Sequence, residues 1–197
     1  GKYVAYALSV EDDYDIHIID LETSEITNLT NRPGDDLHPN WHPDSQRIAF
    51  TSYGRWSGNI EEGGTGGIYV IDVQTMDVEM ILDGPKNEQQ PHWSPDGSMI
   101  AYLHPRTGSS DTDISLITLE DRSTRFITLN TTLEFDNPTW VSNSEMIVRL
   151  IDPPGQVTGE YELYHIDGTS LGTFRPPFRV NDIEIRPGYS HELSSWA

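Results

Sequence analysis

Apolar and polar residues alternate over short stretches along most of the chain, and these stretches recur at a regular spacing. The run Ile48-Ala49-Phe50 returns as Ile100-Ala101-Tyr102 and as Ile147-Val148-Arg149, and Val4-Ala5-Tyr6 is the same element. Further alternating stretches end at turn residues and lie at 16–20, 68–72, 114–118 and 163–167. Alternation with a period of two residues is typical of half-buried β-strands, and no helical period is sustained anywhere. The pattern therefore predicts an all-β chain.

A tryptophan motif precedes each of the three later runs and sets the length of the repeat. Residues 39–45 read Pro-Asn-Trp-His-Pro-Asp-Ser and residues 91–97 read Pro-His-Trp-Ser-Pro-Asp-Gly, and the motif returns at 138–143 and weakly at 183–188. Proline fixes φ, and Gly or Asn tolerates a positive φ, so each motif predicts a tight turn. Four short strands in about 45 to 50 residues are typical of a β-propeller blade. The predicted structural residues are Trp41, Trp93, Trp140, Pro95, Asp96 and Gly97.

The repeat predicts a single propeller region over residues 1–197, built of four-stranded antiparallel blades, with about four repeats present. Its blades lie at 35–86, 87–133 and 134–180, with partial blades at 1–34 and 181–197. If residues 182–187 pair with Val4-Ala5-Tyr6, four blades close into a ring. If Leu193 to Trp196 pairs with 182–187 instead, the chain is an open arc and part of a larger propeller or an oligomer, because unpaired strand edges invite association. We favour the arc.

Charge and composition exclude several classes of function. The chain has 12 Lys plus Arg against 32 Asp plus Glu, a formal net charge of −20, which repels nucleic acid and anionic lipid. There is no cysteine, so disulfides, thiolate metal sites and thiol nucleophiles are excluded. No apolar run approaches the length of a membrane span, and no signal peptide precedes the first strand. The acidity favours a setting outside the cytoplasm.

Enzymatic motifs fail when tested against the chemistry that each requires. Gly188-Tyr189-Ser190-His191 lacks the second glycine of a nucleophile elbow, and Ser195 stands where a zincin that began at His191-Glu192 would need its second histidine. The glycines at 63–67 lack the Lys-Ser/Thr that completes a phosphate-binding loop. We therefore predict no catalytic residue and no cofactor in this chain.

Binding is the remaining class, and the segment 53–67 is its best candidate. Tyr53, Arg55 and Trp56 precede the glycines, and aromatic and Arg side chains on loops are typical binding anchors. An alternative is that Trp56 folds back onto a blade.

Acidic residues supply a second candidate site. Each precedes a Trp position or its equivalent by three to six residues, and the set is Asp35, Asp36, Glu88, Asp136 and Asp182. At the same place in every blade they would form an acidic ring around the axis, able to bind cations or a basic peptide. Alternatively they accept hydrogen bonds from adjoining loops.

Metal binding is a further open possibility. Loop acids at 11–13 and 111–113 leave calcium open as a ligand, although neither cluster follows the EF-hand pattern. His38, His42 and His92 lie near the Trp motifs, but their spacing is that of the repeat and not that of a metal motif.

The order Pro-x-Trp-Ser-Pro-Asp-Gly, then Ile-Ala-Tyr, then a strand ending in Asp resembles the TolB-like, WD-related propeller repeat, best at 91–102. Departures are Ser45 for Gly, Val-Ser-Asn at 141–143 for Ser-Pro-Asp, and Ile185 for Trp. The resemblance implies a radial array of blades, a role in protein contacts and a periplasmic or extracellular location. The same blades also cap peptidases.

These observations favour a non-enzymatic scaffold that recognises another protein or another domain of its parent chain. One alternative is the propeller segment of a larger hydrolase, either a prolyl-oligopeptidase-like peptidase or a polysaccharide-degrading enzyme, whose catalytic residues lie outside this chain. Another is an extracellular structural or assembly subunit.

Overall fold

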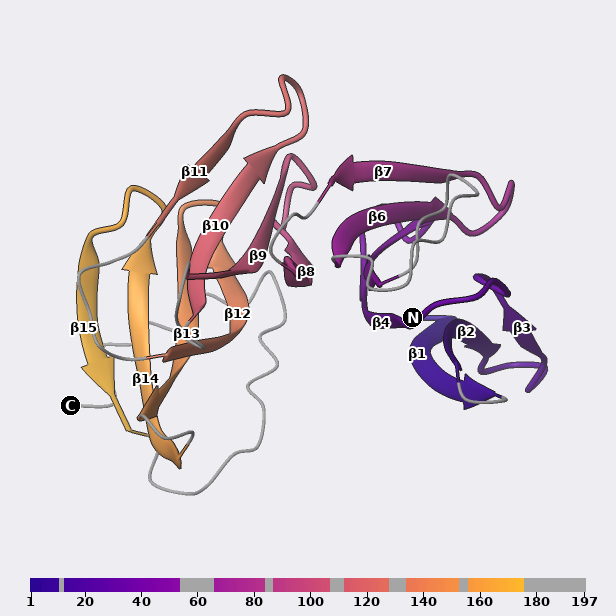
Figure 1. The fold of residues 1–197 in the computed structure, drawn as a ribbon, viewed down its shortest axis with the longest axis horizontal. Helices are drawn as coiled ribbons and strands as arrows, with labels where there is room; N and C mark the ends of the chain where they lie inside the picture. The colour runs from indigo at the N-terminus through magenta and orange to yellow at the C-terminus, as the bar shows by residue number, and fades with distance from the viewer. Residues whose placement is uncertain are drawn as a thin grey trace.

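Every regular element in the described part of the chain is a β-strand. The computed structural model describes residues 1–10, 13–53, 66–83, 87–106, 112–127, 134–152 and 156–175. Within these ranges fifteen strands form four separate antiparallel sheets, one of three strands and three of four (Figure 1). No helix long and apolar enough to cross a membrane occurs in these ranges. The all-β prediction is confirmed.

Each sheet is built from strands that follow one another along the chain, and we call the sheets blades 1 to 4. Blade 1 comprises β1 (Tyr3–Val10), β2 (Asp13–Asp20) and β3 (Ile26–Asn28). Blade 2 comprises β4 (Asp36–Trp41), β5 (Arg47–Ser52), β6 (Gly67–Asp72) and β7 (Val78–Leu82). Blade 3 comprises β8 (Gln89–Trp93), β9 (Met99–Pro105), β10 (Thr112–Thr118) and β11 (Thr124–Phe126). Blade 4 comprises β12 (Glu134–Ser142), β13 (Glu145–Asp152), β14 (Gln156–His165) and β15 (Ser170–Phe174).

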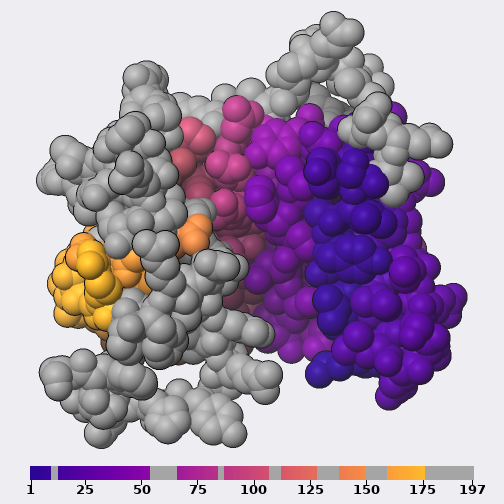
Figure 2. All heavy atoms as spheres, turned by 90° about the horizontal axis from the view of Figure 1, so that it is seen from below, coloured from indigo at the N-terminus to yellow at the C-terminus, as the bar shows by residue number. Residues whose placement is uncertain are grey.

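Successive blades meet at their first strands, which we call the inner strands. β4 contacts both β1 and β8, and β8 contacts β12. Among the described strands, none of blade 1 contacts any of blade 4, so these strands form an arc. Figure 2 shows the N-terminal strand and the C-terminal described strand at opposite ends of one face. Residues 182–187 and 193–196, on which ring closure was predicted to depend, lie outside the described residues.

The core consists of three apolar clusters, each shared by two neighbouring blades. The Trp of one blade belongs to the same cluster as the alanine of the Ile-Ala run in the preceding blade, Trp93 with Ala49 and Trp140 with Ala101. Trp41 and Ala5 both pack against the third cluster, although the Trp41 indole is only half-buried. Burying one large apolar side chain contributes about 2 kcal/mol.

A β-bulge interrupts the inner strands of blades 2 and 3. The pairing register shifts between Leu37 and Asn40 and between Gln89 and His92. His38 and Gln90, which lie inside these bulges, have φ of 55° and 54°. Such backbone in a non-glycine residue costs about 1 kcal/mol or more. A bulge also reverses the alternation of side chains, so residues before and after it face different neighbours.

Candidate binding face

The starts of the inner strands and the ends of the second strands lie together at one end of each blade. Antiparallel pairing places Asp36 opposite Ser52 in blade 2 and Gln89 opposite Leu103 in blade 3. The Tyr53 N–H donates to the carbonyl oxygen of Asp35 over 2.9 Å. We call this end the inner-strand face, and it is defined by Asp35, Asp36, Ser52, Tyr53, Glu88, Gln89 and His104.

Tyr53 and Gly66 stand at the two ends of the segment 54–65, and both are bound to blade 3. The Tyr53 hydroxyl donates to Gln89 Oε1 over 3.0 Å, and the Gly66 N–H donates to Asn87 Oδ1 over 2.9 Å. A Cβ at Gly66 would lie 2.8 Å from Tyr53 Cε1, so glycine is required for this close approach. Burial, followed by the charge of Asp35, raises the pKa of the Tyr53 phenol. Arg55 and Trp56 lie outside the described residues.

The two inner-strand carboxyls of this face are buried. Asp36 and Glu88 are each 2% exposed, so the carboxyls of these two members of the predicted acidic ring are buried. Side chains of a strand point alternately to the two faces of its sheet. In an array of blades both faces of an inner strand are covered by neighbours, and Asp36 accordingly contacts Thr30, which follows the last strand of blade 1.

Asp36 and Glu88 occupy the same place in the repeat but have different partners. Asp36 accepts hydrogen bonds from the hydroxyls of Ser52 and Thr30, whereas Glu88 Oε1 lies 3.1 Å from His104 Nδ1. Burial raises the pKa of Asp36 to about 7. The two hydroxyls act in the opposite direction, and the negative charges of Asp15 and Asp35 add to the increase. The two carboxyls have different partners because His104 of blade 3 occupies the position that Ser52 occupies in blade 2.

The other two predicted acids do not belong to this set. Asp136 directly precedes the bulge of β12 and pairs with Arg149, as Leu37 pairs with Thr51. It therefore stands one register position after the place of Asp36 and Glu88. Asp182 lies outside the described residues.

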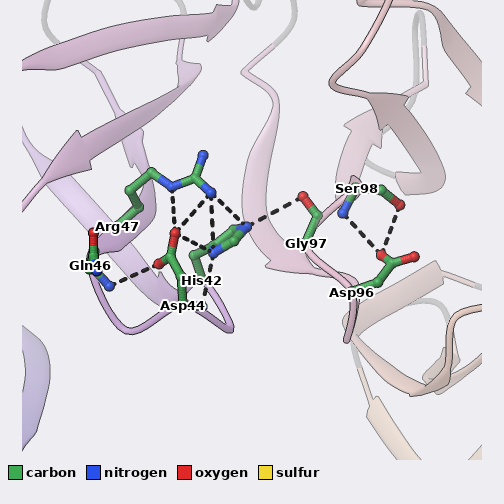
Figure 3. Close-up of polar contacts among 7 residues, drawn as sticks. All are labelled: His42, Asp44, Gln46, Arg47, Asp96, Gly97 and Ser98. Atoms are coloured by element: carbon green, nitrogen blue, oxygen red, sulfur yellow. Dashed lines mark hydrogen bonds and ion pairs between the residues drawn. The ribbon is translucent and has the colours of Figure 1, made fainter.

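At the opposite end of the blades, the turns of the Trp motifs join blade 2 to blade 3 (Figure 3). His42 Nδ1 lies 2.9 Å from Asp44 Oδ2, and His42 Nε2 lies 3.4 Å from the carbonyl oxygen of Gly97. The His42 ring contacts Trp93 edge-on with centroids 4.4 Å apart, and the Arg47 guanidinium lies over the same indole at 5.7 Å. These contacts hold blade 2 against blade 3, and we call the group formed by His42, Asp44, Arg47, Trp93 and Gly97 the interblade clamp.

Asp96 organises the turn that holds Gly97. Burial alone would raise the pKa of Asp96, but the Ser98 N–H and the hydroxyls of Ser94 and Ser98 donate to its carboxylate and lower the pKa overall. Gly97 has φ +73°, and a Cβ there would lie 2.1 Å from His42 Nε2. Both properties make glycine the only residue that fits without rearrangement.

The three histidines near the Trp motifs are directed to different partners. His38 Nδ1 lies 3.4 Å from Thr51 Oγ1, His42 belongs to the clamp, and the His92 carbonyl accepts from Trp140 Nε1 over 2.9 Å. Within the described ranges, no group of three or more His, Cys, Asp or Glu is placed to hold a metal ion. The loop acids Glu11, Asp12 and Asp111 lie outside those ranges.

Several interblade contacts were not anticipated from the sequence. The N–H groups on the free edge of β8 donate to the preceding blade, Gln90 to Thr51 Oγ1 over 3.1 Å and Trp93 to Asn40 Oδ1 over 2.9 Å. Capping of edge donors by side chains protects an inner strand from foreign pairing. The sequence feature that could have indicated these contacts is the polar residue that directly precedes each Trp of the repeat.

The sheet order and the meeting of successive blades at their inner strands define a β-propeller architecture. The chain belongs to the TolB β-propeller domain family, whose model matches residues 1–182. It is 26% identical over 106 residues to the Tol-Pal system protein TolB of Alcanivorax borkumensis, a match that covers 54% of this chain and 23% of that relative. The chain thus matches about a quarter of the relative's length.

Solved structures show the same fold. The crystal structure of TolB from Acinetobacter baumannii matches 86% of this chain and 39% of its own, with a TM-score of 0.68 and 21% identity. A structure from a study of two prolyl endopeptidases matches 90% of this chain and 34% of its own, with a TM-score of 0.58 and 16% identity. The fold therefore occurs both in TolB and within peptidases.

Proposed function

We propose that this chain is a non-enzymatic propeller scaffold that binds a protein partner, in the periplasm or outside the cell, through the inner-strand face and the segment that follows Tyr53. The observation that carries the proposal is the attachment of both ends of that segment to blade 3, Tyr53 to Gln89 and Gly66 to Asn87. Anchored ends reduce the entropy lost when a loop binds, which favours affinity. Membership of the TolB domain family supports the same role.

The chemistry of the partner follows from charge. A net charge of −20 attracts a basic segment and repels an acidic one, and this attraction weakens as salt screens it. Tyr53, Arg55 and Trp56 are proposed as contact residues, with the aromatic rings packing on the aliphatic parts of the partner's side chains.

The test is calorimetric titration with a Lys-rich peptide at low and moderate ionic strength. We expect saturable binding by the wild type that weakens with salt and is lost in Trp56→Ala. Met76→Ala is the matched control, because Met76 is 44% exposed on a turn between β6 and β7, away from the inner-strand face. Equal binding by all three proteins would contradict the assignment of the site.

A second candidate, a propeller segment of a larger hydrolase, is favoured by the match to a prolyl endopeptidase structure, of which this chain covers 34%. In that case the catalytic residues lie elsewhere in a longer protein. The coding sequence on both sides of residues 1–197 discriminates the two proposals: a hydrolase domain with a Gly-x-Ser-x-Gly elbow supports the second candidate. A continuous run of further blades without such a domain supports the scaffold.

A further inference from the structure

Two carboxyl groups are buried where blade 1 packs on blade 2. Asp15 of β2 is 6% exposed and Asp36 of β4 is 2% exposed. One oxygen of each, Asp15 Oδ1 and Asp36 Oδ1, is buried without a hydrogen-bond partner. An uncompensated buried charge is costly, so burial favours the protonated form of Asp36.

We propose that Asp36, buried with Asp15 between blades 1 and 2, acts as a proton-dependent latch, which holds the blades together while Asp36 carries a proton and loosens when Asp36 is ionised. The latch does not depend on the partner-binding role proposed above.

A hydrogen-bond chain connects the latch to the backbone of blade 1. The Ile16 N–H donates to Thr30 Oγ1 over 2.9 Å, and the Thr30 hydroxyl, which is fully buried, donates to Asp36. Asp15 Oδ2 accepts from Asn28 Nδ2 over 2.8 Å. A change in the ionisation state of Asp36 therefore alters the hydrogen bonds of Thr30, which connect Asp36 to β2 and to the residues that follow β3.

Two acidic groups act on Asp36. Asp15 approaches it from β2 and Asp35 from the residue before β4, and both raise the pKa of Asp36 after the larger effect of burial. Asp35 Oδ1 also accepts from the Tyr14 N–H over 3.1 Å. Asp13 begins β2, and Arg32, the nearest basic residue along the chain, is exposed between β3 and β4.

The repeat contains its own comparison. Glu88 holds the equivalent place in blade 3, and its carboxylate is paired with His104, whose position is taken by Ser52 in blade 2. Asp36 therefore has hydroxyl donors where Glu88 has an imidazole nitrogen, and we place the latch at the junction of blades 1 and 2 only.

The sign of the effect follows from linkage. The pKa of Asp36 rises from 3.8 to about 7 on folding, so the folded state binds the proton more tightly. Its contribution to stability is fully present below pH 3.8 and is lost as pH rises through 7. Between pH 6 and pH 8 such a shift corresponds to about a tenfold loss in the equilibrium constant for closure of the latch.

The experiment is amide hydrogen exchange between pH 6 and pH 8, corrected for intrinsic rates and carried out with EDTA to remove cations. We expect protection of β1, β2 and β3 to fall about tenfold in the wild type relative to β8, β9 and β10. In Asp36→Asn, which keeps the acceptor oxygen, this relative fall should disappear. Glu25 is an exposed residue of blade 1, and Glu25→Gln makes the same change in net charge. This variant should retain the relative fall in protection.

A ¹³C carboxyl titration of the wild type gives a direct second measurement. A midpoint for Asp36 near 7 supports the latch, and a midpoint near the ordinary value of 3.8 overturns it. The proposal also fails if Asp36→Asn keeps the dependence of the wild type. If Asp36→Asn does not fold, Asp15→Asn supplies the alternative, and there the Asp36 midpoint should move down because a neighbouring negative charge has been removed.

Discussion

Trp93 illustrates how one residue of the repeat stabilises two blades. Its indole is 5% exposed and packs in a cluster with Ala49, Ile68 and Val70 of the preceding blade. We expect Trp93→Ala to lower the free energy of unfolding by about 3 to 5 kcal/mol, as large-to-small core changes do. Urea denaturation measures this change, and Trp41→Ala, which removes a half-buried indole, should lose less. A wild-type midpoint for Trp93→Ala would contradict the packing.

The polar atoms of two equivalent indoles give a finer prediction. Trp140 Nε1 donates to the His92 carbonyl over 2.9 Å, whereas Trp93 Nε1 is buried without a partner. Trp140→Phe leaves a carbonyl without its donor, but Trp93→Phe removes an N–H that was never paired. We therefore expect Trp140→Phe to destabilise the fold by about 1 kcal/mol more than Trp93→Phe does. Equal midpoints in urea would show that this hydrogen bond contributes nothing.

The turn after Trp93 tests a backbone requirement. Gly97→Ala places a Cβ against His42 at φ +73°, so we expect a loss of about 1 to 3 kcal/mol. Ser45 occupies the equivalent turn with φ of 59°, and Ser45→Gly should be neutral or stabilising by up to about 1 kcal/mol because it relieves a left-handed non-glycine residue. Thermal melts of the two variants should move in opposite directions or differ clearly in size.

At the scale of strands and loops, the segment between Tyr53 and Gly66 joins β5 to β6. Removal of residues 57–64 retains both anchored ends, and loop length affects stability only logarithmically. We expect a cooperative thermal transition close to that of the wild type together with loss of binding to the Lys-rich peptide. A deletion that fails to unfold cooperatively would show that the segment supports the fold.

The same scale shows what the sequence could and could not predict. The Trp-bearing strands, the Ile-Ala-aromatic strands and the turns between them follow from local chemistry, namely alternation, Pro and Gly. The direction of Asp36 and Glu88 does not follow, because a bulge at His38 or Gln90 reverses the alternation and is not visible as a break in the pattern. Their partners are Thr30, which follows the last strand of the preceding blade, and His104, which lies on the neighbouring strand, and only the three-dimensional pairing brings them together.

For the whole molecule, the uncovered edge of the arc has consequences for association. Among the described strands β1 pairs only with β2, and its residues Val4 and Leu8 are 45% and 43% exposed. A long uncharged edge strand favours pairing with another chain. We expect light scattering to show concentration-dependent association that Leu8→Lys reduces, with Glu25→Gln as a control that makes the same change in net charge at an exposed position. A monomer at every concentration would indicate that the edge is covered.

The pH dependence of stability is a property of the whole molecule, because it is the sum of the contributions of several turn carboxyls and of the buried carboxyl of Asp36. Turn N–H groups donate to Asp72 and Asp121 and lower the pKa of each carboxyl, and Thr169 lowers that of Asp167 to about 2. These contributions are present above pH 3.8 and are lost as pH falls toward 2, whereas that of Asp36 is lost as pH rises through 7. The two effects have opposite signs, so we expect the melting temperature to be highest at about pH 4 and to fall as pH rises from there to about 7. Asp36→Asn should extend this maximum only on the alkaline side, and Asp167→Asn should reduce the loss only on the acidic side. Melting curves recorded from pH 2 to pH 9 would contradict this account if either variant changed the opposite limb.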